Sequence, residues 1–407
     1  MRVLIVSQYF WPESFRINEV AISLREQGCT VEVLTGVPNY PDGTYFQGYS
    51  SLVPRFERHE GIDVHRLPLI PRRSGRALDL ALNYLSFVVS GILWGPRRLK
   101  GRGFDVVFVY AISPITQALP AILLGRLKGA PVVVWVQDLW PESLEATGFV
   151  RRRGLLNLVA ALVRWIYGHC DLLLVQSAGF LVPVRAMAGA TPVLVHPNPG
   201  EIGFAASPAI CSGSAGELGP GFNIVFAGNI GTVQAIATIV EAAEQLGDIP
   251  TLSIVFVGSG SRSEWLADEV AKRKLTNVRI LGRRPAETMP ALLAEASALL
   301  VTLAKNPNLA LTVPSKIQAY LAAGKPIIAG LDGVGADIVA ASGAGVTAPS
   351  EDAGALARAI RTLYAASSIE REQMGLSGRR YYEDHYEPGM LAARLKQLLA
   401  DTVRDRA

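Results

Sequence analysis

Short apolar runs alternate with helix-length amphipathic segments along most of the chain. The runs are nearly continuous Val, Ile and Leu, which is typical of parallel strands buried on both faces. Helical stretches such as Arg16–Gln27 and Pro120–Lys128 separate them. In the first half the runs are Val3–Val6, Val31–Leu34, Val106–Val109, Val132–Val136 and Leu172–Val175. This alternation predicts an α/β fold with a doubly wound parallel sheet.

A stretch rich in Pro, Gly, Ser and Ala, His196–Gly221, interrupts the pattern near the middle of the chain and reads as a linker. A second series of strand-like runs follows it: Ile224–Ala227, Ser253–Val257, Val278–Leu281, Ala298–Val301 and Pro326–Ala329. We therefore predict two Rossmann-like domains, residues 1–200 and 201–385. After a break at Pro388–Gly389, the terminal helix carries an apolar stripe that needs a partner.

Four strand–turn–helix segments in the second half have the composition of a phosphate site. The first, AGNIGTVQ, places Gly228, Asn229, Gly231 and Gln234 between a strand and a helix, where small residues let the backbone approach a ligand. A plain tight turn is the alternative for this loop alone. The carboxyl ends of parallel strands meet at one sheet edge, so all four segments should lie together. The other three contribute Gly258, Arg283, and the pair Ser315 and Lys316.

Longer motifs carry a family resemblance. AGNIGTVQ, FVGSG, NVRILGRRPAETMPALLAEASALLV and PSKIQAYLAAGKP resemble the donor-binding domain of family 4 glycosyltransferases, which have the GT-B fold. QYFWPESFRINEVA, TGVPNYPDGTYFQGY and VQDLWPESL are similar to the branch that builds bacterial O-antigen, capsule and exopolysaccharide. The resemblance implies two domains facing across a cleft, with the terminal helix, residues 386–407, returning to the first. It also implies retention of configuration and no metal or other cofactor.

The same resemblance implies the substrates. The second domain would bind a nucleoside diphosphate sugar, with UDP as the expected nucleotide, and the first would bind a polyprenyl-diphosphate-linked saccharide. Two departures bear on the donor site. Asn229 and Gln234 stand where many relatives have Arg and Lys, and Leu311 and Ala319 stand where many have the paired glutamates E-x7-E. We expect Lys316 to meet the diphosphate charge instead.

Three carboxylates in the first half are candidate catalytic residues. Glu13 follows the first strand, and Asp138 and Glu142 follow another strand in DLWPES. At a strand end, a carboxylate can accept a proton from an acceptor hydroxyl or bind the transferred sugar. The alternative is structural, with Asp138 capping a turn and Glu142 capping a helix. The five histidines are scattered without ligand spacing and predict no metal site.

The segment Ala77–Pro96 is apolar over most of its length and has basic flanks. We expect a helix lying on a bilayer surface, with Trp94 at the interface; a buried helix and a membrane span are the alternatives. Residues 1–200 hold 20 Lys and Arg against 14 Asp and Glu, so the net positive charge of that half is +6. The flanking cations we assign to an anionic surface or acceptor are Arg72, Arg73, Arg76, Arg97 and Arg98.

This charge excess is too small to predict nucleic-acid binding. The N-terminal sequence runs straight into a strand pattern without a leader-like segment. We therefore expect a cytoplasmic protein attached peripherally to the inner face of the cell membrane. The expected activity is sugar transfer from a nucleotide sugar to a lipid-linked saccharide. Two alternatives remain: a nucleotide-sugar epimerase of GT-B fold, and an inactive nucleotide-sugar or lipid-binding protein.

Overall fold

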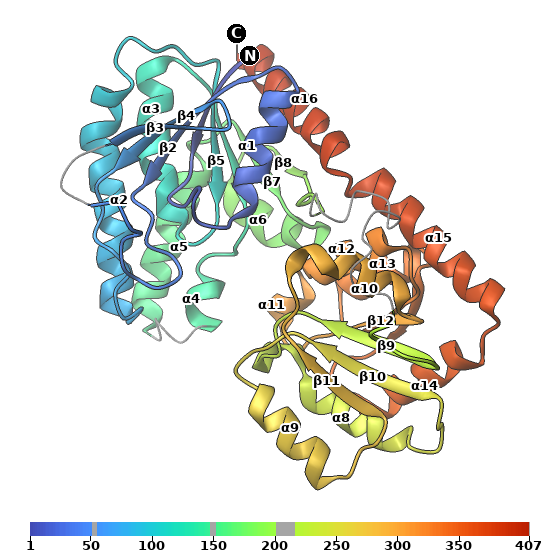
Figure 1. Cartoon of the computed structure of the whole chain (residues 1–407). Coiled ribbons are helices and arrows are strands. Elements are labelled where there is room, and N and C mark those ends of the chain that lie inside the picture. Colours follow the sequence, from blue (N-terminus) through green and yellow to red (C-terminus); the bar gives the residue numbers. More distant parts are fainter. Residues whose placement is uncertain (51–54, 147–151, 201–215, 407) are drawn as a thin grey trace. The chain divides into compact units, whose positions relative to one another are not determined.

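The structure is a computed structural model, and it describes residues 1–50, 55–146, 152–200 and 216–406 (Figure 1). The chain divides into two compact units. The first unit is Met1–Asn198 together with Gly389–Ala407, and the second is Pro199–Pro388. Part of the expected linker, residues 201–215, lies outside the described residues.

The first unit contains an eight-stranded sheet in the order β3-β4-β2-β1-β5-β6-β7-β8. All neighbouring strands in this sheet are parallel except β3 and β4. Its strands are β1 (Arg2–Val6), β2 (Thr30–Gly36), β3 (Arg55–His59), β4 (Ile62–Leu67), β5 (Val106–Ala111), β6 (Val132–Val136), β7 (Leu172–Val175) and β8 (Val193–Val195). Its helices are α1 (Arg16–Glu26), α2 (Ala77–Arg98), α3 (Ala118–Lys128), α4 (Glu142–Ala146), α5 (Arg153–Tyr167), α6 (Leu181–Ala188) and α16 (Pro388–Arg406).

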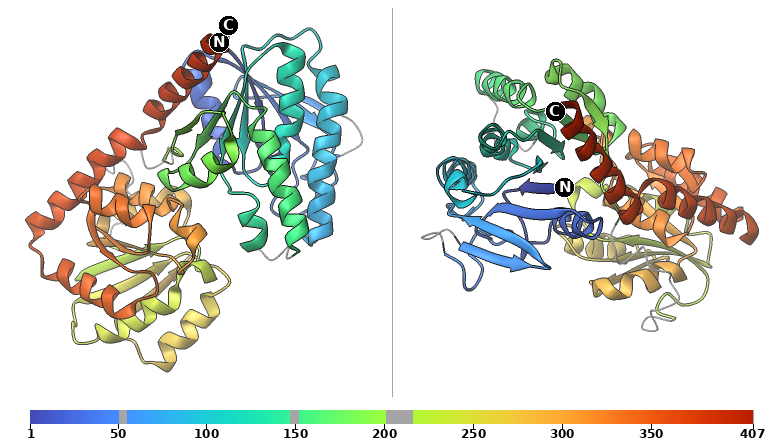
Figure 2. Two further views of the ribbon diagram at one scale, coloured as in Figure 1. Left: turned by 180° about the vertical axis from the view of Figure 1, so that it is seen from behind. Right: turned by 90° about the horizontal axis from the view of Figure 1, so that it is seen from above.

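Helices α1 and α16 cover one face of this sheet. Leu395 and Leu399 of α16 belong to the same buried cluster as Ile17 and Leu24 of α1 and the side chains on that sheet face. The Lys396 ammonium donates to the Gln27 carbonyl at 2.6 Å. The two chain ends consequently lie side by side (Figures 1 and 2). The apolar stripe of α16 is thus buried against α1 and the sheet of the first unit.

Helix α2 packs closely against α3 on the opposite face. A Cβ added at Gly91 would stand 2.6 Å from the Pro120 Cβ, so only glycine allows this approach. Asn83, which interrupts the apolar sequence, is fully buried, and its amide donates to the Ile70 carbonyl at 2.6 Å. The domain side of α2 is therefore tightly packed, and its polar residue is satisfied.

The other side of α2 is exposed and apolar. Leu78, Leu85, Val89, Ile92 and Leu93 are 72%, 59%, 46%, 40% and 51% exposed. Among the described residues, α2 is the one helix long and apolar enough to cross a membrane by length and composition, a test that core helices of soluble proteins also pass. Helix α5 also exposes Leu155, Leu158 and Trp165.

The hairpin of β3 and β4 was not predicted. Its strands carry charged residues, yet Arg66 is fully buried and His65 is 3% exposed. The Arg66 guanidinium donates to Glu57 at 2.5 Å, and His65 Nε2 lies 3.1 Å from Glu32 Oε2. Glu60 and Gly61, with φ of 47° and 75°, form the tight turn. Ion pairing thus allows a polar strand to be buried.

The second unit contains a six-stranded, all-parallel sheet in the order β11-β10-β9-β12-β13-β14. Its strands are β9 (Phe222–Ala227), β10 (Leu252–Val257), β11 (Val278–Gly282), β12 (Ala298–Thr302), β13 (Ile327–Gly330) and β14 (Gly345–Ala348). Its helices are α8 (Ile236–Gln245), α9 (Ser263–Lys272), α10 (Met289–Glu295), α11 (Pro307–Ala310), α12 (Ser315–Ala323), α13 (Val334–Ala341), α14 (Ala353–Ala365) and α15 (Ser368–His385).

Both units therefore have the predicted doubly wound architecture. In the second unit, two separate apolar clusters fill the space between the sheet and the helices on either face. Every strand expected from an apolar run is present. The edge strands β8 and β14 were missed because β8 has only three residues and β14 contains Gly345 and Thr347, so neither forms an apolar run of strand length.

Candidate functional site

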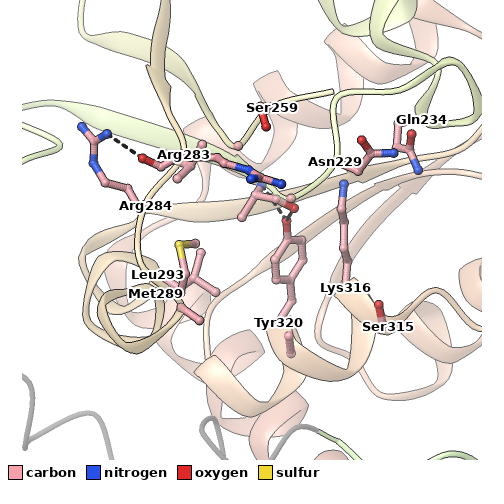
Figure 3. A pocket seen from close by; sticks show the side chains of 16 residues that line it. Asn229, Gln234, Ser259, Arg283, Arg284, Met289, Leu293, Ser315, Lys316 and Tyr320 are labelled. Carbon is pink, nitrogen blue, oxygen red and sulfur yellow. Dashed lines mark hydrogen bonds between the residues drawn. The ribbon is translucent and has the colours of Figure 1, made fainter. Parts of the chain in front are cut away.

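A cavity of about 550 Å³ opens at the carboxyl ends of the strands of the second unit (Figure 3). Four separate chain segments build it, and these are the four turns that the sequence singles out. Its wall consists of Ala227, Gly228, Asn229, Gln234, Val257, Gly258, Ser259, Arg283, Arg284, Ala286, Met289, Leu293, Ser315, Lys316, Ala319 and Tyr320. Of the residues expected to bind the donor, seven line the cavity. The eighth, Gly231, is not part of the wall but lies against the side chains of Asn229 and Gln234, which are.

Two glycines let the loops after β9 and β10 touch. Gly258 has φ +142°, and a Cβ there would stand 1.9 Å from the Gly228 carbonyl oxygen. The Gly228 amide donates to the Val257 carbonyl at 2.8 Å, which fixes the two loops together. A Cβ at Gly231 would meet the side chains of Asn229 and Gln234, each at 2.8 Å. The glycines thus keep this end of the cavity open and bring backbone close to any occupant.

Lys316 is the main charged group inside the cavity. Its Nζ is buried, has no hydrogen-bond partner among the described residues, and lies 3.5 Å from the centre of the Phe226 ring. Figure 3 shows the side chain directed toward Asn229 and Gln234. Burial lowers the pKa of the Lys316 ammonium to about 7. An unpaired buried cation is costly, and an anion in the cavity would compensate it.

The rest of the wall favours an anion as well. Ser315 and Lys316 begin α12, so free backbone amides and the positive end of the helix dipole stand beside Lys316. Arg283 is exposed at the rim. Its neighbour Arg284 is paired with Glu217, and this contact holds Arg284 at the edge. The cavity wall contains no carboxylate. The position of the second family glutamate is Ala319, which lines the cavity with a methyl group.

Some residues of this wall were not predicted from the sequence. Tyr320 is fully buried, and its hydroxyl accepts a hydrogen bond from the Ala227 amide at 3.0 Å, tying α12 to β9. Met289 and Leu293 of α10 give the cavity an apolar end. The sequence does offer a signal for Met289 and Leu293, because the helix that contains them follows directly after the Arg283 turn. No group of His, Cys, Asp or Glu that could hold a metal ion is found in the described part of the chain.

In the first unit, Asp138 lies two residues after the end of β6. Its Oδ2 accepts hydrogen bonds from the Ser113 amide at 2.9 Å and from the Ser113 hydroxyl at 2.8 Å. The Trp140 indole donates to the same hydroxyl at 3.0 Å. No described residue donates to Oδ1. Asp138 is therefore held in place at one oxygen and stays available to a ligand at the other.

Glu13 has a different place from the one expected. It is 1% exposed, and its carboxylate accepts from the amides of Phe10, Asn39 and Tyr40 at 3.3, 2.8 and 2.8 Å. Burial raises the pKa of Glu13 to about 7, against the opposing effect of these amides. That pKa would suit a general base, but the carboxylate is buried and is occupied by three backbone amides. Its contacts make it a clamp between two loops.

Replacing Glu13 by Ala should destabilise the first unit by about 3 kcal/mol or more, since three buried amides lose their acceptor. Urea unfolding measures this loss. Glu19→Ala, which removes a partly exposed carboxylate paired with Arg16, should change stability by less than about 0.5 kcal/mol. Equal stability of the two variants would contradict the assigned role.

The remaining predicted residues lie on or near α2 and α4. Glu142 is half-buried at the start of α4, while its neighbours Ser143 and Leu144 line a second cavity. Arg76 precedes α2 and Arg73 is exposed before it; Trp94 is 43% exposed. At the other end, Arg97 is exposed and donates to the Leu93 carbonyl at 2.6 Å, and Arg98 is partly exposed. Arg72 faces inward, toward the second cavity.

Two family models match this chain. Residues 14–199 match the model described as Glycosyl transferase 4-like domain, and residues 221–366 match Glycosyl transferases group 1. The chain is a family 4 glycosyltransferase. The WcaI protein of Escherichia coli (strain K12), which is named as a glycosyl transferase of colanic acid biosynthesis, is 28% identical over 346 residues, covering 80% of this chain and 82% of the relative. The enzyme is thus of the exopolysaccharide-biosynthesis type, as its motifs predicted.

Solved structures confirm the GT-B fold. HepE of Anabaena, solved with UDP, has a TM-score of 0.70 at 14% identity and covers 98% of this chain and 100% of its own. Sucrose-phosphate synthase of Thermosynechococcus elongatus has a TM-score of 0.72 at 17% identity, covering 98% of each chain. The trehalose-6-phosphate enzyme of E. coli bound with UDP-2-fluoro glucose has a TM-score of 0.72 at 11% identity, covering 98% and 99%.

Proposed function

We propose that this glycosyltransferase moves a sugar from a UDP-sugar to a polyprenyl-diphosphate-linked saccharide, with retention of configuration. The observation that carries the donor half is Lys316, a buried ammonium without a partner, set at a helix start between two glycine loops. A diphosphate supplies the missing negative charge. The solved relatives that hold UDP or a UDP-sugar support this choice of donor.

Charge stabilisation explains how such a site promotes transfer without a metal. As the bond between sugar and diphosphate breaks, negative charge grows on the leaving phosphate. Lys316 and the α12 amides stabilise that charge where it develops. Asp138 of the first unit would then bind the transferred sugar or accept the proton of the acceptor hydroxyl. The sugar passes to that hydroxyl, and the nucleoside diphosphate leaves.

Nucleotide release tests this function. The purified enzyme is incubated with UDP-, GDP- or ADP-sugars and a polyprenyl-diphosphate-linked saccharide, and free nucleotide and product are measured. We expect release that requires both substrates, and the product's anomeric configuration reports retention. Interconversion of the donor without acceptor would indicate an epimerase. Binding of nucleotide sugar without turnover would indicate an inactive binding protein.

We also propose that the first unit attaches to the cytoplasmic membrane through α2. An acceptor carried on a lipid stays in the bilayer, so the enzyme must come to it. The exposed leucines of α2 and the basic residues at its ends supply the two signals that reversible attachment needs. Helix α5 exposes further apolar side chains in the same unit.

Attachment of this kind should depend on salt and on the flanking charge. Retention on liposomes containing phosphatidylglycerol should fall as salt is raised, because exposed charges are screened. The double change Arg97→Glu/Arg98→Glu should weaken binding by about 2 kcal/mol or more, some 30-fold. Arg358→Glu/Arg380→Glu, which changes two exposed arginines of the second unit, is the matched control. If the double variant and this control bind alike, α2 is not the membrane contact.

A further inference from the structure

A second cavity, of about 630 Å³, lies wholly within the first unit. Helix α2, the start of α3, Trp140 together with the start of α4, and α5 surround it. Most of its wall is aliphatic or aromatic, including Leu80, Val88, Leu119 and Leu162. Leu85 belongs both to this wall and to the exposed apolar face of α2. The cavity is therefore continuous with the surface that we assign to the membrane.

The polar end of this cavity carries an unpaired cation. The Arg72 guanidinium lies 5.0 Å from the centre of the Tyr40 ring and 6.0 Å from that of Tyr9. No carboxylate among the described residues forms an ion pair with it. Its backbone amide donates to Asn39 Oδ1 at 3.0 Å, which helps to fix the turn before α2. Placed over two rings and lacking a carboxylate partner, the Arg72 guanidinium can bind an anion at this end of the cavity.

Asp138 stands close to this cavity, and the hydroxyl of Tyr84 in its wall lies within electrostatic range of both Arg72 and Asp138. Ser113 lines the cavity and donates to the Asp138 carboxylate from both its amide and its hydroxyl. Trp140 also lines the cavity and is bonded to that hydroxyl. The candidate catalytic carboxylate is therefore one hydrogen-bonded residue away from the cavity wall.

We infer that this cavity holds the first part of the acceptor's lipid chain, with the lipid phosphate at Arg72. The inference rests on the proposed function and adds to it a binding site for the lipid itself. A saccharide or nucleotide would leave most of its polar groups unpaired against such a wall. An aliphatic chain with one anionic end fits both the apolar wall and the polar end of the cavity. The chain packs against the wall, and the phosphate forms an ion pair with Arg72. A phosphate held there leaves the attached saccharide on the side of Asp138.

Binding of a short prenyl diphosphate tests the site directly. Farnesyl diphosphate is titrated into the full-length enzyme by calorimetry, with farnesol and inorganic diphosphate for comparison. We expect farnesyl diphosphate to bind at least tenfold more tightly than either. Ala81→Trp places an indole in the cavity from an exposed helix position and should weaken this binding at least tenfold. Arg72→Gln should reduce farnesyl diphosphate affinity to that of farnesol.

Leu127→Trp, at an exposed position of the neighbouring helix α3 and outside the cavity wall, should bind farnesyl diphosphate like the unaltered enzyme. Circular dichroism and urea unfolding check that the first unit of each variant is folded. If Ala81→Trp leaves prenyl affinity unchanged, the chain is not in this cavity. Equal competition by dihexanoyl-phosphatidylglycerol would assign the cavity to membrane phospholipid and overturn the inference. Sugar transfer by an enzyme that binds no prenyl diphosphate refutes this site alone, whereas prenyl binding without transfer refutes the proposed function alone.

Discussion

Asp138→Asn should lower the rate of sugar transfer by about 100- to 10,000-fold, the range for loss of an acid–base group. An asparagine keeps an oxygen that can accept from Ser113, so the local fold survives. What is lost is the negative charge at the second oxygen, which no described residue contacts. Steady-state kinetics with the lipid-linked acceptor measure the effect, which should appear in kcat rather than in UDP affinity.

Asp105→Asn is the matched control for this change. Asp105 also accepts a backbone amide, that of Arg2, but it is exposed and lies away from both cavities. Its variant should transfer sugar at close to the original rate. A pH profile distinguishes the two roles open to Asp138: loss of an acidic limb indicates a general base, and a profile of unchanged shape indicates a sugar-binding residue. Full activity of Asp138→Asn would remove it from the site.

Lys316→Ala should weaken UDP binding by about 1.5–3 kcal/mol, the range for a charge-assisted contact, or roughly 10- to 150-fold. The effect should be large because Lys316 is the one buried cation of the cavity wall, with Arg283 exposed and Arg284 paired to Glu217. Calorimetry measures the affinity. Lys305→Ala, which alters an exposed lysine outside that wall, should leave it unchanged. Unchanged affinity in Lys316→Ala would exclude the lysine from the donor site.

The same lysine predicts a pH dependence. With the pKa of Lys316 near 7 in the free enzyme, raising the pH above that value deprotonates the ammonium and removes the charge that the diphosphate needs. UDP affinity should therefore fall between pH 7.5 and 8.5, by up to about tenfold per pH unit. The phosphate is already ionised in this range. The slope should disappear in Lys316→Ala, and a slope that persists there has another origin.

Local patterns were enough to predict the layered fold and that the four glycine- and cation-bearing turns of the second unit meet at one cavity. Continuous apolar runs identify the buried strands because parallel strands are covered on both faces. Glycine turns between those strands and the following helices then had to converge, since the carboxyl ends of parallel strands share one edge. Seven of the eight residues expected there line one cavity. The exposed apolar face of α2 was likewise visible in the sequence.

Features built by contacts between distant segments needed the tertiary structure. Glu13 is a clamp because the amides of Asn39 and Tyr40 fold onto it, and no spacing in the sequence shows that. The β3–β4 hairpin is polar in sequence, and Arg66 can be buried there because Glu57 and the carbonyls of Gly36 and Trp11 accept its hydrogen bonds. The wall of the second cavity brings together Arg72 and Leu162, which are ninety positions apart in the sequence. The clamp, the hairpin and the cavity all depend on contacts between side chains or backbone groups far apart in the sequence. Local propensity and periodicity contain no information about such contacts.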